Sequence, residues 1–187
     1  LGTGVSNSSP TTSCFAGASP SGGVGTAGFV NGLTTTARFN NPKGIAIDKA
    51  GNIFIADSGN HSIRMITTSG VVTTIAGNGT SGYVNGHGTN ARFNAPIGIA
   101  TDGSNILYVT DSGNCAIRKL VLTSDKSSSY VSTYAGPTTD ITSGNCSFVN
   151  DTRLKSRFNN PKGIWRDSNG YLYITDTGNH TIRKITE

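Results

Sequence analysis

The sequence predicts an all-β fold in which one unit of short antiparallel strands is repeated. Two recurring phrases and the composition predict it. The first phrase, Arg-Phe-Asn-x-Pro-x-Gly-Ile, begins at Arg38, Arg92 and Arg157. The second, Asp-Ser/Thr-Gly-Asn-x-x-Ile-Arg, begins at Asp57, Asp111 and Asp176. Matching positions lie 54 and then 65 residues apart, a period typical of repeat architectures. The 25 glycines and a charged fraction of 13% fit strands and turns better than a helical bundle.

The first unit predicts four strands. Residues 44–48 and 53–57 are short apolar runs, and 58–60 read Ser-Gly-Asn, a tight turn in which Gly or Asn takes a positive φ. Residues 62–66 alternate apolar with polar side chains, as a half-buried strand does, and 71–77 form a fourth strand. Four short antiparallel strands make one blade of a β-propeller.

The later units repeat this pattern with one omission. The second unit predicts strands at 98–102, 106–111, 116–122 and 130–136, and the third at 163–167, 171–176 and 181–186. The third unit has no fourth strand before the sequence stops. The missing phrase stands instead at Thr11, Thr12, Ser13, Cys14, Phe15, Ala16 and Gly17, which align with 71–77 and 130–136. The register is therefore permuted.

The expected organisation follows from that permutation. Residues 1–10 are an N-terminal extension, 11–17 the outer strand of a blade completed elsewhere, 28–77 blade one, 82–136 blade two, and 147–187 blade three without its outer strand. A loop before each Arg-Phe-Asn carries an aromatic residue, which we expect to anchor the loop against the neighbouring blade: Phe29, Tyr83 or Phe148.

These phrases resemble NHL repeats, named for an Asn-His-Leu tripeptide. That tripeptide stands here as Asn60-His61-Ser62, Asn114-Cys115-Ala116 and Asn179-His180-Thr181, and the resemblance covers roughly residues 11–187. The family forms β-propellers, commonly six-bladed, so the resemblance implies a larger ring of which this sequence supplies three blades. The rest comes from a longer parent chain or from a second copy. Strand 11–17 would then complete blade three of another copy, giving a dimer or a fibre.

The sequence favours a non-catalytic role in structure or protein interaction. NHL-like propellers include peptide-amidating lyases and lactonase-like enzymes that hold a metal in the central channel. This sequence has three histidines, at 61, 87 and 180, and none falls on a predicted inner strand. We therefore expect no catalytic residue, no metal ion and no cofactor. An enzyme of that kind remains the alternative hypothesis.

A third hypothesis is RNA binding, as in the propellers of tripartite-motif proteins. The net charge is +5, but six of the fifteen basic residues recur once per repeat. Residues that recur in this way satisfy the structural unit rather than form a nucleic-acid patch, so we expect no nucleic-acid partner. No apolar run approaches the roughly 20 residues needed for a spanning helix, so we expect no membrane segment in this sequence.

The repeated acids also point to structure rather than chemistry. Asp57, Asp111 and Asp176 each precede a turn, and an Asp at such a position can accept hydrogen bonds from the turn's backbone amides. They are also placed to pair with the repeated Arg. The repetition breaks at Trp165 and Arg166, where the other units have Ala46-Ile47 and Ala100-Thr101. These two side chains face a channel, face an interface, or pack locally.

Cysteines and glycosylation sequons indicate a secreted or cell-surface location. Antiparallel pairing brings Cys115 and Cys146 to the same end of blade two, which favours a disulfide and leaves Cys14 over. Asn-x-Ser/Thr sequons in loop-like sequence predict N-linked glycans at Asn7, Asn78, Asn145 and Asn150. Two weaker candidates, Asn60 and Asn179, occupy the repeat itself.

Overall fold

A computed structural model describes residues 11–18, 25–138 and 146–186, and within them the chain forms three antiparallel sheets. The first sheet has the order β1-β5-β4-β3-β2, with β1 (Gly32–Leu33), β2 (Pro42–Ile47), β3 (Ile53–Asp57), β4 (Ser62–Ile66) and β5 (Val71–Ala76). The second has the order β6-β10-β9-β8-β7, with β6 (Gly86–His87), β7 (Pro96–Thr101), β8 (Ile106–Asp111), β9 (Ala116–Leu122) and β10 (Ser129–Ala135). The third holds only β11 (Pro161–Arg166), β12 (Leu172–Asp176) and β13 (Thr181–Ile185).

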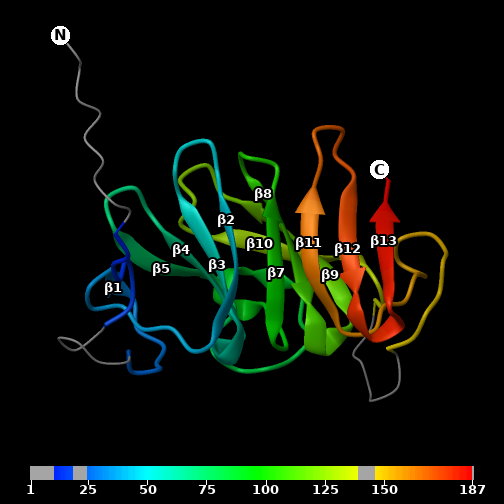
Figure 1. Ribbon diagram of the computed structural model, residues 1–187, viewed down its shortest axis with the longest axis horizontal. Coiled ribbons are helices and arrows are strands. Elements are labelled where there is room, and N and C mark those ends of the chain that lie inside the picture. Colours follow the sequence, from blue (N-terminus) through cyan, green and yellow to red (C-terminus); the bar gives the residue numbers. More distant parts are fainter. Residues whose placement is uncertain (1–10, 19–24, 139–145, 187) are drawn as a thin grey trace, which may run out of the picture.

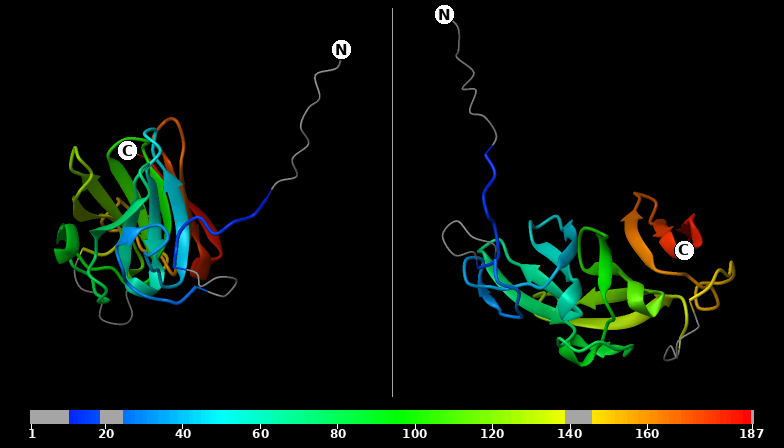
Figure 2. Two further views of the ribbon diagram at one scale, coloured as in Figure 1. Left: turned by 90° about the vertical axis from the view of Figure 1, so that its left-hand side faces the viewer. Right: turned by 60° about the horizontal axis from the view of Figure 1, so that its bottom comes forward.

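The sheets follow one another along the length of the molecule. Figure 1 shows the inner strands β2, β7 and β11 in succession, with residues 11–18 at one end and β13 at the other. The right-hand view of Figure 2 shows the same succession from another side. Short 3₁₀ turns connect the second and third strands of each sheet, at η1 (Ser58–Asn60), η3 (Ser112–Asn114) and η4 (Thr177–Asn179), and a further one, η2 (Gly88–Asn90), follows β6. The arrangement is all-β and propeller-like.

The strands predicted within the three units are present, several with an end displaced by one residue, and two differences are larger. Each first strand begins two residues earlier than expected, at Pro42, Pro96 and Pro161, because the proline pairs with the Asp that ends the next strand across a register shift. In addition, β1 and β6 were not predicted. They are two-residue strands that pair with the outer strands β5 and β10, and two residues are too few to show a period.

The strand predicted at residues 11–17 is not a regular strand in the structure. This segment runs along the end of the first sheet, where the Gly17 amide donates to the Thr34 carbonyl oxygen at 2.8 Å. A β-strand requires a partner for its backbone groups. Within the described residues no strand pairs with this segment. The sequence pattern of an outer strand is therefore present without its sheet.

Buried apolar side chains fill the space between successive sheets. Phe54, Ile63 and Ile75 of the first sheet belong to one cluster with Phe93 and Leu107 of the second. A second cluster joins the second and third sheets, through Tyr108, Ile117, Tyr134, Phe158 and Ile174. Successive sheets therefore share a core, and burial of this apolar surface holds the array together.

Candidate functional site at the open third blade

A fully buried arginine stands at the centre of each complete sheet. In the second sheet, Nη1 of Arg118 donates to Oδ2 of Asp111 at 2.8 Å and to the Arg92 carbonyl oxygen at 3.0 Å. Its Nη2 donates to the Val84 carbonyl oxygen at 3.0 Å and to Oδ1 of Asn85 at 2.7 Å. The Arg118 guanidinium thereby links the loop that contains Val84 and Asn85 to the sheet. The predicted pairing of repeated Asp with repeated Arg occurs in all three sheets, as Asp57–Arg64, Asp111–Arg118 and Asp176–Arg183.

The loop aromatics pack on this arginine rather than on the neighbouring blade. The Arg118 guanidinium lies 4.7 Å from the ring centroid of Tyr83 and 5.2 Å from that of Phe93. The other sheets repeat the sandwich, with Phe29 and Phe39 around Arg64 and Phe148 and Phe158 around Arg183. The expected anchor is therefore an anchor to the loop's own sheet, through cation–π contacts that the linear pattern did not reveal.

The other repeated acids serve turns. Oδ1 of Asp102 accepts from the amides of Ser104 and Ile106, at 2.8 and 3.0 Å. Asp48 and Asp167 accept in the same way after the other first strands. For Asp111, burial raises the pKa of the carboxyl above its ordinary value, against the opposing effects of Arg118 and Asn114. These carboxylates are engaged by the fold itself.

The third sheet ends at an open edge. In the first sheet, β4 pairs with β5 on its outer side, with Ile63 opposite Ala76 and Arg64 opposite Thr74. Within the described residues no strand pairs with the outer side of β13. The face of the third sheet that a following sheet would cover is open as well: Ile182 is 70% exposed, whereas Ile63 and Ile117, which hold the same position in the complete sheets and pack in the clusters between sheets, are 0% exposed.

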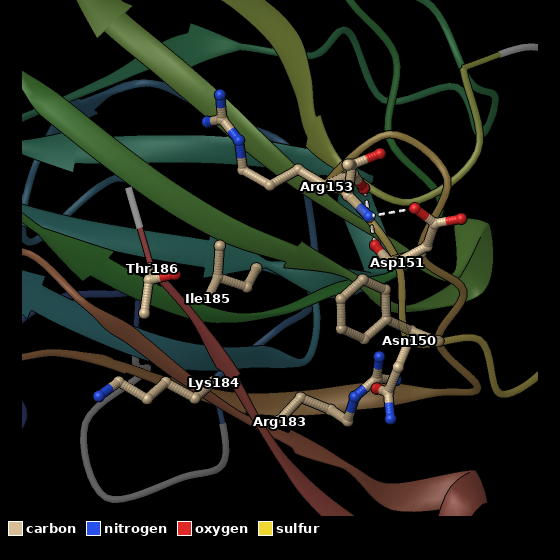
Figure 3. A pocket seen from close by; sticks show the side chains of 10 residues that line it. Asn150, Asp151, Arg153, Arg183, Lys184, Ile185 and Thr186 are labelled. Atoms are coloured by element: carbon tan, nitrogen blue, oxygen red, sulfur yellow. Dashed lines mark hydrogen bonds between the residues drawn. The ribbon is translucent and has the colours of Figure 1, made fainter.

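A pocket of about 310 Å³ occupies the place of the missing strand. Figure 3 shows its two walls. Residues 183–186 of β13 and the segment after it form one wall, and Asn150, Asp151 and Arg153 of the preceding loop form the other. Figure 3 also shows the Arg183 side chain extending toward the loop near Asn150.

The segment at residues 11–18 carries the junction contacts of an outer strand. The Gly17 amide donates to Thr34, as that of Gly77 donates to Gly88 and that of Gly136 to Arg153. The three glycines share a positive φ, of 115°, 84° and 110°. Phe15 is nevertheless 65% exposed, whereas the equivalent side chains Ile75 and Tyr134 are 1% and 5% exposed. Cys14 beside it is an exposed free thiol.

The predicted disulfide is present between Cys115 and Cys146, whose Cα atoms lie 5.5 Å apart. Cys115 occupies the position at which the first sheet has His61, whose side chain makes a hydrogen bond to the second sheet. Nδ1 of His61, at the equivalent position, accepts from the Ala95 amide at 3.0 Å. Where the first repeat has a histidine that makes a hydrogen bond, the second repeat therefore has a cysteine that forms a disulfide.

The break in the repeat lies on an exposed face. The Trp165 side chain is 63% exposed and lies 6.1 Å from the ring of Tyr173, centroid to centroid. With Arg166 it also lines a pocket of about 280 Å³ along the inner strands of all three sheets. The equivalent Ala46 packs into the cluster between the first two sheets, so Trp165 stands where a following blade would pack.

The sequon residues differ in their surroundings. Asn78 and Asn150 are exposed, and Asn150 lies at the open-edge pocket. The amide of Asn60 is committed to the fold, since Nδ2 donates to the Gly28 carbonyl oxygen and to Oδ2 of Asp57, both at 2.8 Å. Asn179 makes the corresponding bonds in the third sheet. The predicted glycan sites Asn7 and Asn145 lie outside the described residues.

The described residues offer neither a metal-ligand cluster nor a membrane-spanning helix. Within those residues, no three His, Cys, Asp or Glu side chains are close enough to hold a metal ion. No helix among them is long and apolar enough to cross a membrane. His87, in β6, packs edge-on against Tyr130 with centroids 4.8 Å apart.

Comparison with known families agrees with this architecture. The profile of the teneurin NHL domain matches residues 30–84, and the NHL repeat profile matches residues 93–120 and 158–185. The chain belongs to the NHL-repeat family. This NHL-repeat chain is 32% identical over 169 residues to NHL repeat-containing protein 2 of Bos taurus, covering 83% of this chain and 22% of the relative. The human protein of the same name is 32% identical over 168 residues.

The NHL-repeat chain spans about a fifth of the length of these relatives. Among solved structures, a protein of unknown function from Bacteroides thetaiotaomicron aligns at 26% identity with a TM-score of 0.65, over 81% of this chain and 37% of that one. An auxiliary nutrient binding protein from Bacteroides ovatus aligns at 25% identity and a TM-score of 0.64, over 89% of this chain and 41% of that one.

Proposed function

We propose that this chain is a non-catalytic extracellular NHL-repeat module that serves structure or protein interaction and self-associates by strand complementation, as a dimer or a fibre. One observation carries the proposal. Among the described residues, the third sheet has no outer strand beside β13, and residues 11–18 make the junction contacts of an outer strand without pairing in a sheet. An exposed edge with unpaired N–H and C=O groups is a template for such strand addition.

The complete sheets set the register of the proposed pairing. In the first sheet Ile66 lies opposite Val72, Met65 opposite Thr73, and Arg64 opposite Thr74. Transferred to the open edge, this register places Thr12 opposite Ile185, Ser13 opposite Lys184, and Cys14 opposite Arg183 of the second copy. Phe15, exposed in the single chain, would then cover the apolar face of blade three.

Two observations support the extracellular location. The Cys115–Cys146 disulfide is of a kind that persists in oxidising compartments. The first repeat matches a profile named for the teneurin NHL domain. N-linked glycans are part of the proposal, with Asn78 the exposed sequon residue, among the described ones, that does not line the open-edge pocket.

The proposal of a non-catalytic role rests on the engagement of the acids. Asp111 accepts three hydrogen bonds, from Arg118, Asn114 and the Asn94 amide. A carboxylate held in this way supports a blade and is not free to act as a base. Stoichiometric metal bound by the purified chain would contradict this part of the proposal and favour a propeller enzyme. A salt-dependent affinity for single-stranded RNA would favour the RNA-binding alternative.

Solution mass tests the self-association. The intact chain should be found at twice its 19.3 kDa mass or at higher multiples. A variant that lacks residues 1–17 should be monomeric, and circular dichroism would verify that its sheets are retained. Added peptide 11–18 should bind to the open edge of that variant. A folded, intact chain that stays monomeric at every concentration would overturn the proposal.

A further inference from the structure

The inner strands of neighbouring sheets meet at a close backbone contact. At the junction between the second and third sheets, a Cβ on Gly98 would collide with the Lys162 carbonyl oxygen. Oγ1 of Thr110 accepts from the Gly98 amide at 2.6 Å and donates to the Lys162 carbonyl oxygen at 2.7 Å. Oγ of Ser112 donates to the Pro161 carbonyl oxygen at 2.6 Å. This junction therefore needs one glycine and two hydroxyls.

The junction between the first and second sheets uses the same glycine and one histidine. A Cβ on Gly44 would collide with the Ile97 carbonyl oxygen. Nδ1 of His61 accepts from the Ala95 amide at 3.0 Å. At each junction the contacting segment of the following sheet begins with a residue of the same backbone conformation. Ala95 has a φ of 49° and Asn160 has a φ of 49°, in the left-handed region.

The third sheet carries the complete set of these groups on an exposed face. Gly163, Thr177 and His180 hold the positions of Gly98, Ser112 and His61. The Gly163 amide donates to Oγ1 of Thr175 at 2.7 Å, as Gly98 does to Thr110. Within the described part of the chain the Thr175 hydroxyl accepts this bond and donates to no protein acceptor. The three atoms nearest to a Cβ on Gly163 would all belong to the Thr175 side chain, at 3.1–3.9 Å, and none of them is a backbone carbonyl oxygen.

The segment that would fit this exposed face lies in the first sheet of the same chain. Asn41, Pro42 and Lys43 hold the positions of 95–97 and 160–162, and all three are exposed. Asn41 has a φ of 51°, the same left-handed backbone as at the two internal junctions. The first sheet also exposes Ile45 and Ile47 on this side, and the third exposes Trp165 and Ile182 on the side it would meet.

We propose that Gly163, Thr175, Thr177 and His180 form a docking site for residues 41–43 of a second copy of this chain. The Lys43 carbonyl oxygen rests on Gly163 and accepts from the Thr175 hydroxyl. The Asn41 amide donates to Nδ1 of His180. This inference rests on the proposed self-association, and it adds that the copies join through their inner strands as one continuous propeller. Two copies then supply six blades, and the contact repeats at both seams.

Point variants test the docking site in the full-length chain. The single chain should tolerate Gly163→Ala, because Gly163 is exposed, its φ is not in the left-handed region, and the atom nearest the new methyl group, Thr175 Oγ1 at 3.1 Å, belongs to an exposed side chain that can shift. Its melting temperature at dissociating dilution should stay within about 2 °C of the wild type. Its dissociation constant should rise about tenfold to a hundredfold, because the added methyl group meets a carbonyl oxygen. Thr175→Val should weaken association about three- to tenfold.

The matched control is Gly98→Ala, which places the same methyl group in an internal junction. It should lower the melting temperature of the single chain, which Gly163→Ala does not. If Gly163→Ala and Thr175→Val both associate as tightly as the wild type while removal of residues 1–17 abolishes association, strand complementation stands and the docking site is wrong. If the wild-type chain does not associate, both proposals fail.

Discussion

Substitution of Asp111 by Asn removes the charge that balances the buried Arg118 and changes the side chain's shape little. Both side chains have no exposed surface. The Asp111 carboxylate accepts from Nη1 of Arg118 at 2.8 Å, from Nδ2 of Asn114 at 2.8 Å and from the Asn94 amide at 2.7 Å. The new amide group has one acceptor oxygen and turns a donor toward these donors. It leaves the guanidinium buried without a counter-charge.

Loss of one partner of a buried ion pair costs about 3–5 kcal/mol. This is a large share of the 5–15 kcal/mol typical of a domain's whole stability. We therefore expect Asp111→Asn to lower the free energy of unfolding by about 3–5 kcal/mol. Urea denaturation followed by circular dichroism measures it, at a protein concentration that keeps the association state constant.

Asp176→Asn is the matched control, because the same pair stands at the open edge. The Arg183 side chain there is 10% exposed, so water compensates part of the loss. We expect this variant to lose less, about 1–3 kcal/mol. If Asp111→Asn unfolds within about 1 kcal/mol of the wild type, the repeated acids do not hold the blades, and the structural reading of these residues is wrong.

Three further outcomes are expected. Cys146→Ser opens a disulfide between residues 31 apart, and should cost about 3–4 kcal/mol of stability by reversible denaturation; an unchanged midpoint would contradict a structural role. Hydrogen bonds from the Thr123 hydroxyl and the Ser127 amide lower the pKa of Asp125 to about 2, below the unfolded value near 3.9, so this charge stabilises the fold above about pH 4 and the benefit is lost as pH falls toward 2. An NMR titration of Asp125 with a pKa near 3.9 would refute it. Expression in a secretory host should add a glycan that Asn78→Gln removes, detected by intact mass.

The periodic part of the fold could be predicted from the sequence, because alternation and turn residues recur with each repeat. The buried arginine was predicted only as a partner of Asp. Its sandwich between Tyr83 and Phe93 was not, because the two rings lie ten residues apart in the sequence and meet only in the folded sheet. The strand at 11–17 was predicted from alignment alone and is not a regular strand in the single chain, since alignment identifies a strand's pattern and not its partner.

The docking site could not be predicted from the sequence. Gly163 looks like any repeated glycine until the backbone places a carbonyl oxygen against Gly44 and Gly98. The need for glycine arises from this approach between sheets, and no local pattern encodes it. The one available signal was that Trp165 interrupts the repeat on the face that a following blade would cover.

The central claim is that the open edge of one copy takes residues 11–17 of another. The most direct test is the rate at which a maleimide labels Cys14. The rate is measured while the intact chain is diluted, and native mass spectrometry separates the associated species from single chains. Cys14 is exposed in the single chain and would lie opposite Arg183 in the paired strand. The account predicts slow labelling in species of twice 19.3 kDa or more, and fast labelling once dilution yields single chains. Fast labelling of Cys14 within the associated species would contradict it.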